Sequence, residues 1–284
     1  MIRATANQNG LTFNASLNGL VVYLDNWAIG DLAEENPSRR RRFIGAMRSG
    51  VDLLFSVTNA AELSGPQGKS AGAVRAFLDE IGPHWFPAKL DPTEVVKCEK
   101  NGESPGAVCI DQMFFKSYLA DLMRTDTGKV IGLSDDFFRL GPIMDSVGPQ
   151  RESICRTSAQ FDELLRNKMS MVRDRAERDP MWFDKRFPRI SFNPTRPALF
   201  VYSNLVRIMV VEASSLKAHD GLDFCHAVMA CTFATFATLD TQWKRRVASL
   251  PTPYRLARVY SKPELDQMVT DIESAVMHRE VKAG

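Results

Sequence analysis

The sequence predicts a three-layer α/β/α protein with a parallel sheet of four or five strands, on the basis of three observations. Short continuous apolar runs, typical of strands buried on both faces, occur at residues 19–24, 51–57 and 234–239. A further strand is expected within residues 254–261, and helical patterns follow the runs. Strands that alternate with helices imply βαβ units, and such units pair their strands in parallel.

The composition is that of a folded protein. The 284 residues are 44% hydrophobic and 25% charged, which excludes a mostly disordered chain and provides material for a core. The net charge of +2 neither requires nor excludes nucleic acid, so only clustered charge can argue for it. The five cysteines have no regular spacing, unlike a disulfide framework, and the reducing cytoplasm is therefore the expected location.

No membrane segment is expected. The first residues, MIRATANQNG, contain no apolar stretch of the kind found in a signal peptide. Residues 224–239 carry no formal charge if His226 is neutral, but this stretch is shorter than the ~20 residues that a spanning helix needs. Its first part is typical of a buried helix and its last part of a strand, so we expect a helix followed by a strand.

The chain is expected to have three parts. Residues 1–18 are polar and are expected to form a loose or hairpin-like extension. Residues 19–90 and 198–284 carry the alternation of strands and helices and together form the α/β domain. Residues 91–197 lie between them and are expected to be a mostly helical insertion. Its clearest helical patterns lie at residues 111–124 and 158–178.

Four carboxylates follow predicted strands or open predicted helices. They are Asp25 after the first strand, Glu62 just past the second, Asp223 at the start of the helix near residue 222, and Asp240 after the strand at 234–239. Because the carboxyl ends of parallel strands share one edge of the sheet with the following helix N-termini, we expect the four to converge. A divalent cation relieves their repulsion, and carboxylate oxygens suit Mg²⁺ or Mn²⁺ rather than zinc.

Each acid is also well placed to cap a helix. Asp25 and Asp240 directly precede predicted helices. Glu62 lies three residues after Asn59, the expected N-cap of its helix, and Asp223 lies three residues after another aspartate, which is the spacing of a capping box. Capping and metal binding therefore both stay open for each acid.

The segments around these acids resemble PIN-domain nucleases. The resembling segments are VVYLDNWAIGDLAE at residues 21–34, LLFSVTNAAELSG at 53–65 and GLDFCHAVMACTFATFATLDTQWKRRV at 221–247. The tail RLARVYSKPELDQMV, residues 255–269, is similar to the last strand and helix of that family. Residues 91–197 show no such resemblance.

The resemblance implies a PIN-like α/β/α domain that cleaves RNA with Mg²⁺ or Mn²⁺, by attack of water on phosphorus, as in a toxin or defence effector. The catalytic and metal-binding residues that it implies are Asp25, Glu62, Asp223 and Asp240. The supporting residues are Asn26, where many members have Thr or Ser, Thr238 of the Thr-x-Asp motif and His226 of the Asp-x-x-His motif.

Clustered basic residues indicate where RNA would lie. One cluster follows the helix that begins at the first acid, and another lies one helical turn past Asp240, where contact with the phosphate backbone requires positive charge. The expected RNA-binding residues are Arg39, Arg40, Lys244, Arg245 and Arg246. In the insertion, basic residues at 173–189 surround Trp182 and two phenylalanines, a combination that either stacks on unpaired bases or covers a helix.

Other chemistries fit the sequence less well. A phosphatase of the haloacid dehalogenase type needs a second aspartate two residues after its nucleophile, and Trp27 stands there. Cys225 and His226 are neighbours on a helix, so their side chains point about 100° apart. Cys98 and Cys109 lack the close pairing of zinc ligands.

Three functions therefore stay open. The first is a metal-dependent ribonuclease, the second a non-catalytic PIN-like module that binds RNA or a protein, and the third a structure-specific nuclease that acts on DNA. An inhibitory or regulatory protein partner and a homo-oligomer are also open. Convergence of the four carboxylates is the observation that separates the two nucleases from the module.

Overall fold

The computed structural model contains the expected parallel sheet. It describes residues 2–7, 10–15, 19–65, 70–104, 110–111, 139–212 and 216–283. The described strands of the sheet, in their spatial order, are β5 (Trp85–Pro87), β4 (Val51–Phe55), β3 (Leu20–Tyr23), β6 (Phe236–Thr238) and β7 (Arg258–Tyr260). All neighbouring pairs are parallel. The expected α/β/α class with a parallel sheet is therefore confirmed.

The two faces of the sheet bury two separate cores. In β3 and the residue that follows it, Val22 and Leu24 belong to one core, whereas Val21 and Tyr23 belong to the other, as the two-residue period of a strand requires. Each of these four side chains is less than 5% exposed. A strand buried on both faces has no polar side, which is why the sequence shows continuous apolar runs here.

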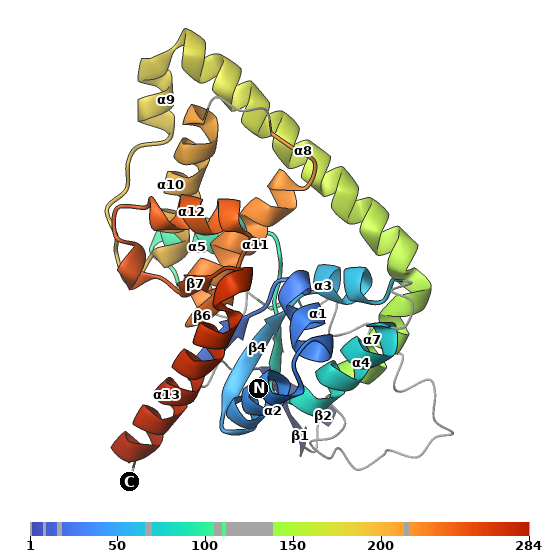
Figure 1. The fold of residues 1–284 in the computed structure, drawn as a ribbon. Helices are drawn as coiled ribbons and strands as arrows, with labels where there is room; N and C mark the ends of the chain where they lie inside the picture. The colour runs from blue at the N-terminus through green and yellow to red at the C-terminus, as the bar shows by residue number, and fades with distance from the viewer. Residues whose placement is uncertain are drawn as a thin grey trace.

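Helices cover both faces (Figure 1). The first face carries α1 (Asn26–Glu34), α2 (Pro37–Arg48), α3 (Val57–Leu63), α4 (Ser70–Ile81), α7 (Leu140–Val147) and α13 (Leu265–Ala283). The second face carries α5 (Thr93–Asn101), α9 (Pro180–Arg186), α10 (Pro197–Val211), α11 (Asp220–Phe233) and α12 (Thr241–Ala248). Short 3₁₀ turns are η3 (Gly148–Gln150), η4 (Pro253–Arg255) and η5 (Lys262–Glu264).

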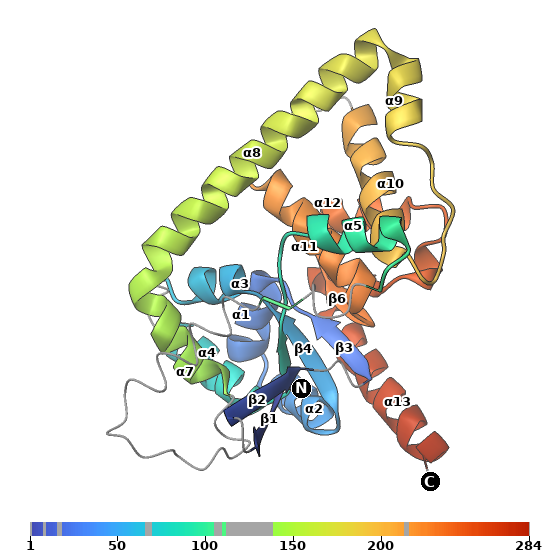
Figure 2. The same cartoon turned by 180° about the vertical axis from the view of Figure 1, so that it is seen from behind.

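The long helix α8 (Arg151–Arg178) joins the two sides of the molecule. Its 28 residues span about 42 Å, and both views show it running from α7 to α9 along the outside (Figures 1 and 2). Ile154 and Cys155 near its start pack on the first core, and Leu165, Met169 and Val172 pack on the second. The expected helix at 158–178 is thus present but begins earlier. The one expected at 111–124 lies outside the described residues, apart from Asp111.

Two local predictions, a hairpin at the N-terminus and a capping box, agree with the structure, and one strand was not predicted. The N-terminal extension contains an antiparallel pair, β1 (Ile2–Asn7) and β2 (Gly10–Ala15), in agreement with a hairpin. The edge strand β5 was not predicted, because its segment contains several prolines and resembles a loop. Proline is tolerated in β5 because the strand lies at the edge of the sheet. The capping box from Ser261 to Glu264 is confirmed.

The apolar stretch at residues 224–239 is part helix and part strand, as expected. Helix α11 ends at Phe233 and β6 begins at Phe236. Across the described ranges, no helix is both long and apolar enough to cross a membrane.

Candidate active site at the carboxyl edge of the sheet

Two of the four predicted acids lie where the direction of the chain across the sheet reverses. Strand β3 leads to β4 on one side, and β6 leads to β7 on the other, although β3 and β6 are neighbours. Asp25 follows β3 and caps α1, while Asp240 follows β6 and caps α12 through the backbone N–H of Trp243. A crevice at such a switch point is where open α/β sheets bind ligands.

Thr238 links the end of β6 to the end of β3 by a hydrogen bond. The backbone N–H of Asp25 donates to the Thr238 hydroxyl at 2.8 Å, and Thr238 is fully buried. Because this bond fixes the backbone at which the Asp25 side chain begins, Thr238 positions Asp25 beside the end of β6. The capping interpretation holds for Asp25 and Asp240 as well, but a capping carboxylate has two oxygens and several lone pairs.

Glu62 joins this edge through Asn26. The Asn26 side-chain amide donates to Glu62 and accepts from the amide of Asn59 at 3.0 Å. The predicted N-cap of α3 is wrong, because Ser56 is the N-cap and forms a capping box with Asn59. Glu62 is therefore not the acid of a capping box.

Asp223 is likewise not the cap of its helix. The N-terminal N–H groups of α11 are held by Asp162 of α8, whose carboxylate accepts from His219 at 3.1 Å, Gly221 at 2.9 Å and Leu222 at 3.2 Å. The preceding acid, Asp220, accepts from the backbone N–H of Lys217 instead. The long insertion helix thus caps α11 and leaves Asp223 in its first turn for another role.

Burial and neighbouring charges raise the pKa of Asp25, Glu62 and Asp223. Burial raises the pKa of Asp223 to about 7, with further increases from the charges of Asp25 and Asp240. Burial and the charge of Asp240 raise the pKa of Asp25 to about 6, although the N–H of Asn26 offsets part of this. Burial first and Asp25 second raise the pKa of Glu62. Asp25 therefore interacts electrostatically with each of the other three acids.

Tyr23 and His226 lie beneath these acids. The Tyr23 hydroxyl and Nδ1 of His226 are 2.5 Å apart. Burial raises the pKa of Tyr23 well above its usual value, and the charges of Asp25, Glu62 and Asp223 raise it further. Burial lowers the pKa of His226 to about 4, so its imidazole is neutral. His226 therefore supports Tyr23 rather than carrying charge.

The raised pKa values make the stability of the metal-free protein depend on pH. In the unfolded chain Asp25 and Asp223 ionise near 3.8, whereas the folded protein retains their protons up to about pH 6 and 7. Between these limits the unfolded chain binds fewer protons, so the free energy of unfolding is expected to fall as pH rises from about 4 to about 7. Thermal melting in EDTA measures this fall, and Asp223→Asn should make it shallower. An identical slope in the variant would contradict the assignment.

The oxygen ligands suit a hard divalent cation held partly through water. In the portion of the chain that the structure describes, no three Asp, Glu, His or Cys side chains are arranged to bind one metal ion directly. Mg²⁺ commonly uses one or two carboxylates and keeps several waters. The carboxylate oxygens at this edge are of the chemical type that such an ion binds.

Most of the predicted RNA-binding residues are engaged within the protein. Arg39 pairs with Asp31 and Asp266 at 2.8 and 2.7 Å, and Arg40 pairs with Glu80 at 2.8 Å. These two arginines fasten α2 to its neighbours, so the predicted RNA contact at this cluster is not supported.

The cluster after Asp240 divides into buried and exposed members. Arg246 is 2% exposed and pairs with Glu212 at 2.8 Å, so it is a packing residue. Lys244 pairs with Glu264. The Arg245 side chain is 74% exposed and leaves its charge available to a ligand.

The aromatic residues of the insertion face inward. The Arg175 guanidinium lies 4.1 Å from the centre of the Trp182 ring, and Phe183 is buried beneath Arg207. They cover the helices, as one of the two interpretations expected. Burial also raises the pKa of Cys225 well above its usual value, which argues against a thiolate nucleophile. Cys109 lies outside the described residues.

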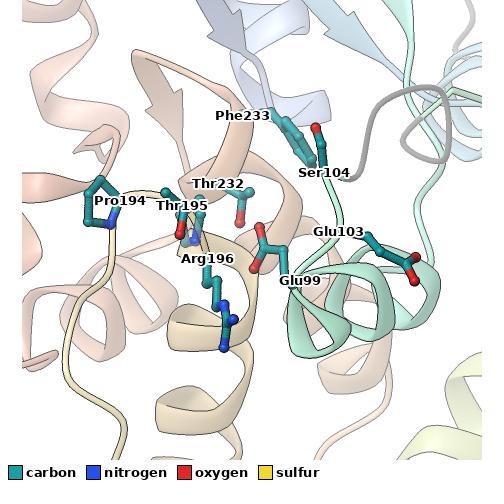
Figure 3. A pocket seen from close by; sticks show the side chains of 10 residues that line it. Glu99, Glu103, Ser104, Pro194, Thr195, Arg196, Thr232 and Phe233 are labelled. Carbon is teal, nitrogen blue, oxygen red and sulfur yellow. The ribbon is translucent and has the colours of Figure 1, made fainter.

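A separate cavity of about 510 Å³ lies at the other end of α11 (Figure 3). Thr232 in this cavity and Asp223 both belong to α11, and the difference between their positions, 232 − 223, corresponds to roughly 14 Å along the helix. The buried Glu99 at its wall accepts the backbone N–H groups of Ala198 and Leu199 and thereby caps α10. This carboxylate is explained by packing, and none of the predicted site residues lines the cavity.

Comparison with family models, with curated proteins and with solved structures finds no match to this chain. The function of this chain is therefore inferred from the geometry and chemistry of the carboxyl edge.

Sequence reasoning did not identify Tyr23 or Asp162. Tyr23 stands two residues before Asp25, and the two-residue period of a strand could have placed it beneath that acid. Asp162 carries no comparable sequence signal, because it caps a helix almost 60 positions away.

Proposed function

We propose that this chain is a ribonuclease that depends on Mg²⁺ or Mn²⁺. The observation that supports the proposal most is the mutual coupling of Asp25, Asp223 and Asp240, with Glu62 beside them, at the switch point of a parallel sheet. Burial and like charge at one edge make ionisation of these acids unfavourable, so a purely structural role does not explain why they are placed together. A cation removes that penalty.

Each side chain has a distinct part in the proposed reaction. Asp25 and Asp223, whose pKa values are raised to about 6 and about 7, would hold the metal ion, with Asp240 acting directly or through water. When bound, the ion would activate a water for attack on phosphorus and would neutralise charge on the phosphoryl oxygens and on the leaving oxygen as its P–O bond breaks. Glu62, oriented by Asn26, accepts a proton from the attacking water. Thr238 fixes the backbone of Asp25.

The surface next to these acids suits a polyanion. A cavity of about 770 Å³ opens beside Asp240, and its charged side chains are all basic. They are Lys217, Lys244 and Arg245. Positive charge at this position attracts the phosphate backbone toward the acids, whose own negative charge would otherwise repel it.

The purified protein is expected to cleave a mixed RNA pool with Mg²⁺ or Mn²⁺ and to be inactive in EDTA. Glu34→Gln is a matched control, because Glu34 is an exposed acid on α1 and is expected to leave cleavage unchanged. Preferential cleavage of structured DNA would favour the DNA nuclease. RNA binding without cleavage under every metal condition would instead favour the non-catalytic module.

A further inference from the structure

A groove leads away from the acidic edge along α12. It starts at the cavity beside Asp240, which Thr241 and Arg245 line, and continues into a second cavity of about 350 Å³. Lys244 and Ala248 line both cavities, so the two adjoin at α12, and together they are called the groove.

Two arginines in the groove retain charge that the protein does not neutralise closely. The side chains of Arg245 and Arg258 are 74% and 70% exposed. Their nearest ion-pair partners are Glu212 at 3.9 Å and Asp271 at 3.8 Å. These separations exceed hydrogen-bond distance, unlike the 2.7–2.8 Å pairs that Arg39 forms. Both guanidinium groups can therefore bind another anion at little cost.

An exposed aromatic ring stands at the far end of the groove. Tyr254 lines the second cavity and is 78% exposed. Within the residues that the structure describes, Tyr254 is the only aromatic side chain among the large hydrophobic ones that are exposed. It lies within η4, where Pro253 restricts the backbone, so the ring is presented by a short stiff turn.

We propose that this groove binds a single-stranded nucleic acid, with Arg245 and Arg258 on its phosphates and Tyr254 stacked on one unpaired base. Base–aromatic stacking tolerates any sequence but requires a base that is free of its pair, so a duplex does not satisfy the Tyr254 position. One part of the inference rests on the proposed ribonuclease function: the scissile phosphate lies at the Asp240 end of the groove.

Binding without metal tests the groove separately from catalysis. The probe is a labelled oligouridine of about 12 nucleotides, within the size range of single-strand sites, and its anisotropy is followed in EDTA. Tyr254→Ala is expected to weaken binding about tenfold, and Tyr254→Phe to restore it. Arg245→Ala and Arg258→Ala should each weaken binding and reduce the dependence of log affinity on log salt by about 0.7.

Matched controls decide between this groove and general electrostatic attraction. Arg48→Ala removes an exposed cation at the end of α2, far along the chain from the groove, and should leave affinity unchanged. Equal losses for Arg48→Ala, unchanged binding for Tyr254→Ala, or equally tight binding of duplex RNA would each overturn the inference. Preference for an acidic peptide of equal charge would do so as well. Tyr254-dependent RNA binding without cleavage would refute the ribonuclease while leaving the groove supported.

Discussion

Asp223→Asn is expected to lower RNA cleavage about 100-fold or more without lowering the stability of the metal-free protein. A neutral amide is a weaker ligand for Mg²⁺ than a carboxylate, so both the affinity for divalent ions and the rate should fall. Stability is preserved for a structural reason. Asp162, not Asp223, caps α11, and removing one of several coupled negative charges relieves repulsion.

The measurement is cleavage of an RNA pool in Mn²⁺, paired with thermal melting with and without the ion. Asp174→Asn is the matched control, because it makes the same chemical change at an exposed position on α8. If the Asp223→Asn variant cleaves RNA as fast as the unchanged protein and still melts at a higher temperature with the metal ion, Asp223 is not a catalytic residue.

Asp162→Ala is expected to give the largest loss of stability, about 3–5 kcal/mol. The Asp162 side chain is 3% exposed and accepts from three backbone N–H groups and from Arg166, so alanine leaves buried donors and a cation without their acceptor. The contact also allows the left-handed backbone of His219, whose φ is 75°. Cleavage should fall too, since Asp223 lies on the helix that Asp162 holds.

Two further variants show whether the contact itself is responsible. Glu163→Ala changes an exposed neighbour on α8 and should alter the free energy of unfolding by less than about 0.5 kcal/mol. Gly221→Ala keeps Asp162 but places a Cβ atom 2.9 Å from its backbone oxygen, so it should destabilise the same contact. Urea unfolding monitored by circular dichroism gives all three values. A loss below about 1 kcal/mol for Asp162→Ala would show that α11 does not depend on this cap.

The edge strand β5 shows where local sequence is insufficient. Its three residues, Trp85–Pro87, have too little length for a hydrophobic period, and the surrounding prolines resemble a loop. Pairing with β4 makes the segment a strand, and that pairing is a long-range interaction. The wrong N-cap of α3 has a local cause instead. Ser56 and Asn59 are close in sequence, and both residue types are common N-caps.

The basic residues show the same limit more strongly. Arg39, Arg40 and Arg246 lie in runs that are typical of a phosphate-binding surface, yet each is committed to an acid from another element. Arg245 and Arg258 are exposed, and their ion pairs with Glu212 and Asp271 are longer, at 3.9 and 3.8 Å. A run of charges in a sequence does not distinguish these two situations, because the distinction depends on which acids the fold brings nearby.

The sequence alone determined the layered class and the placement of Asp25 and Asp240. Apolar runs buried on both faces specify strands of a parallel sheet, and the residues that follow such strands must share one edge. Tertiary structure decided which acid caps which helix and which arginines pair closely with an acid. It also decided that α8 holds the helix of Asp223. The physical reason is that the sequence pattern records burial, whereas these contacts join polar groups from elements far apart in the chain, whose pairing is fixed only when both cores are packed.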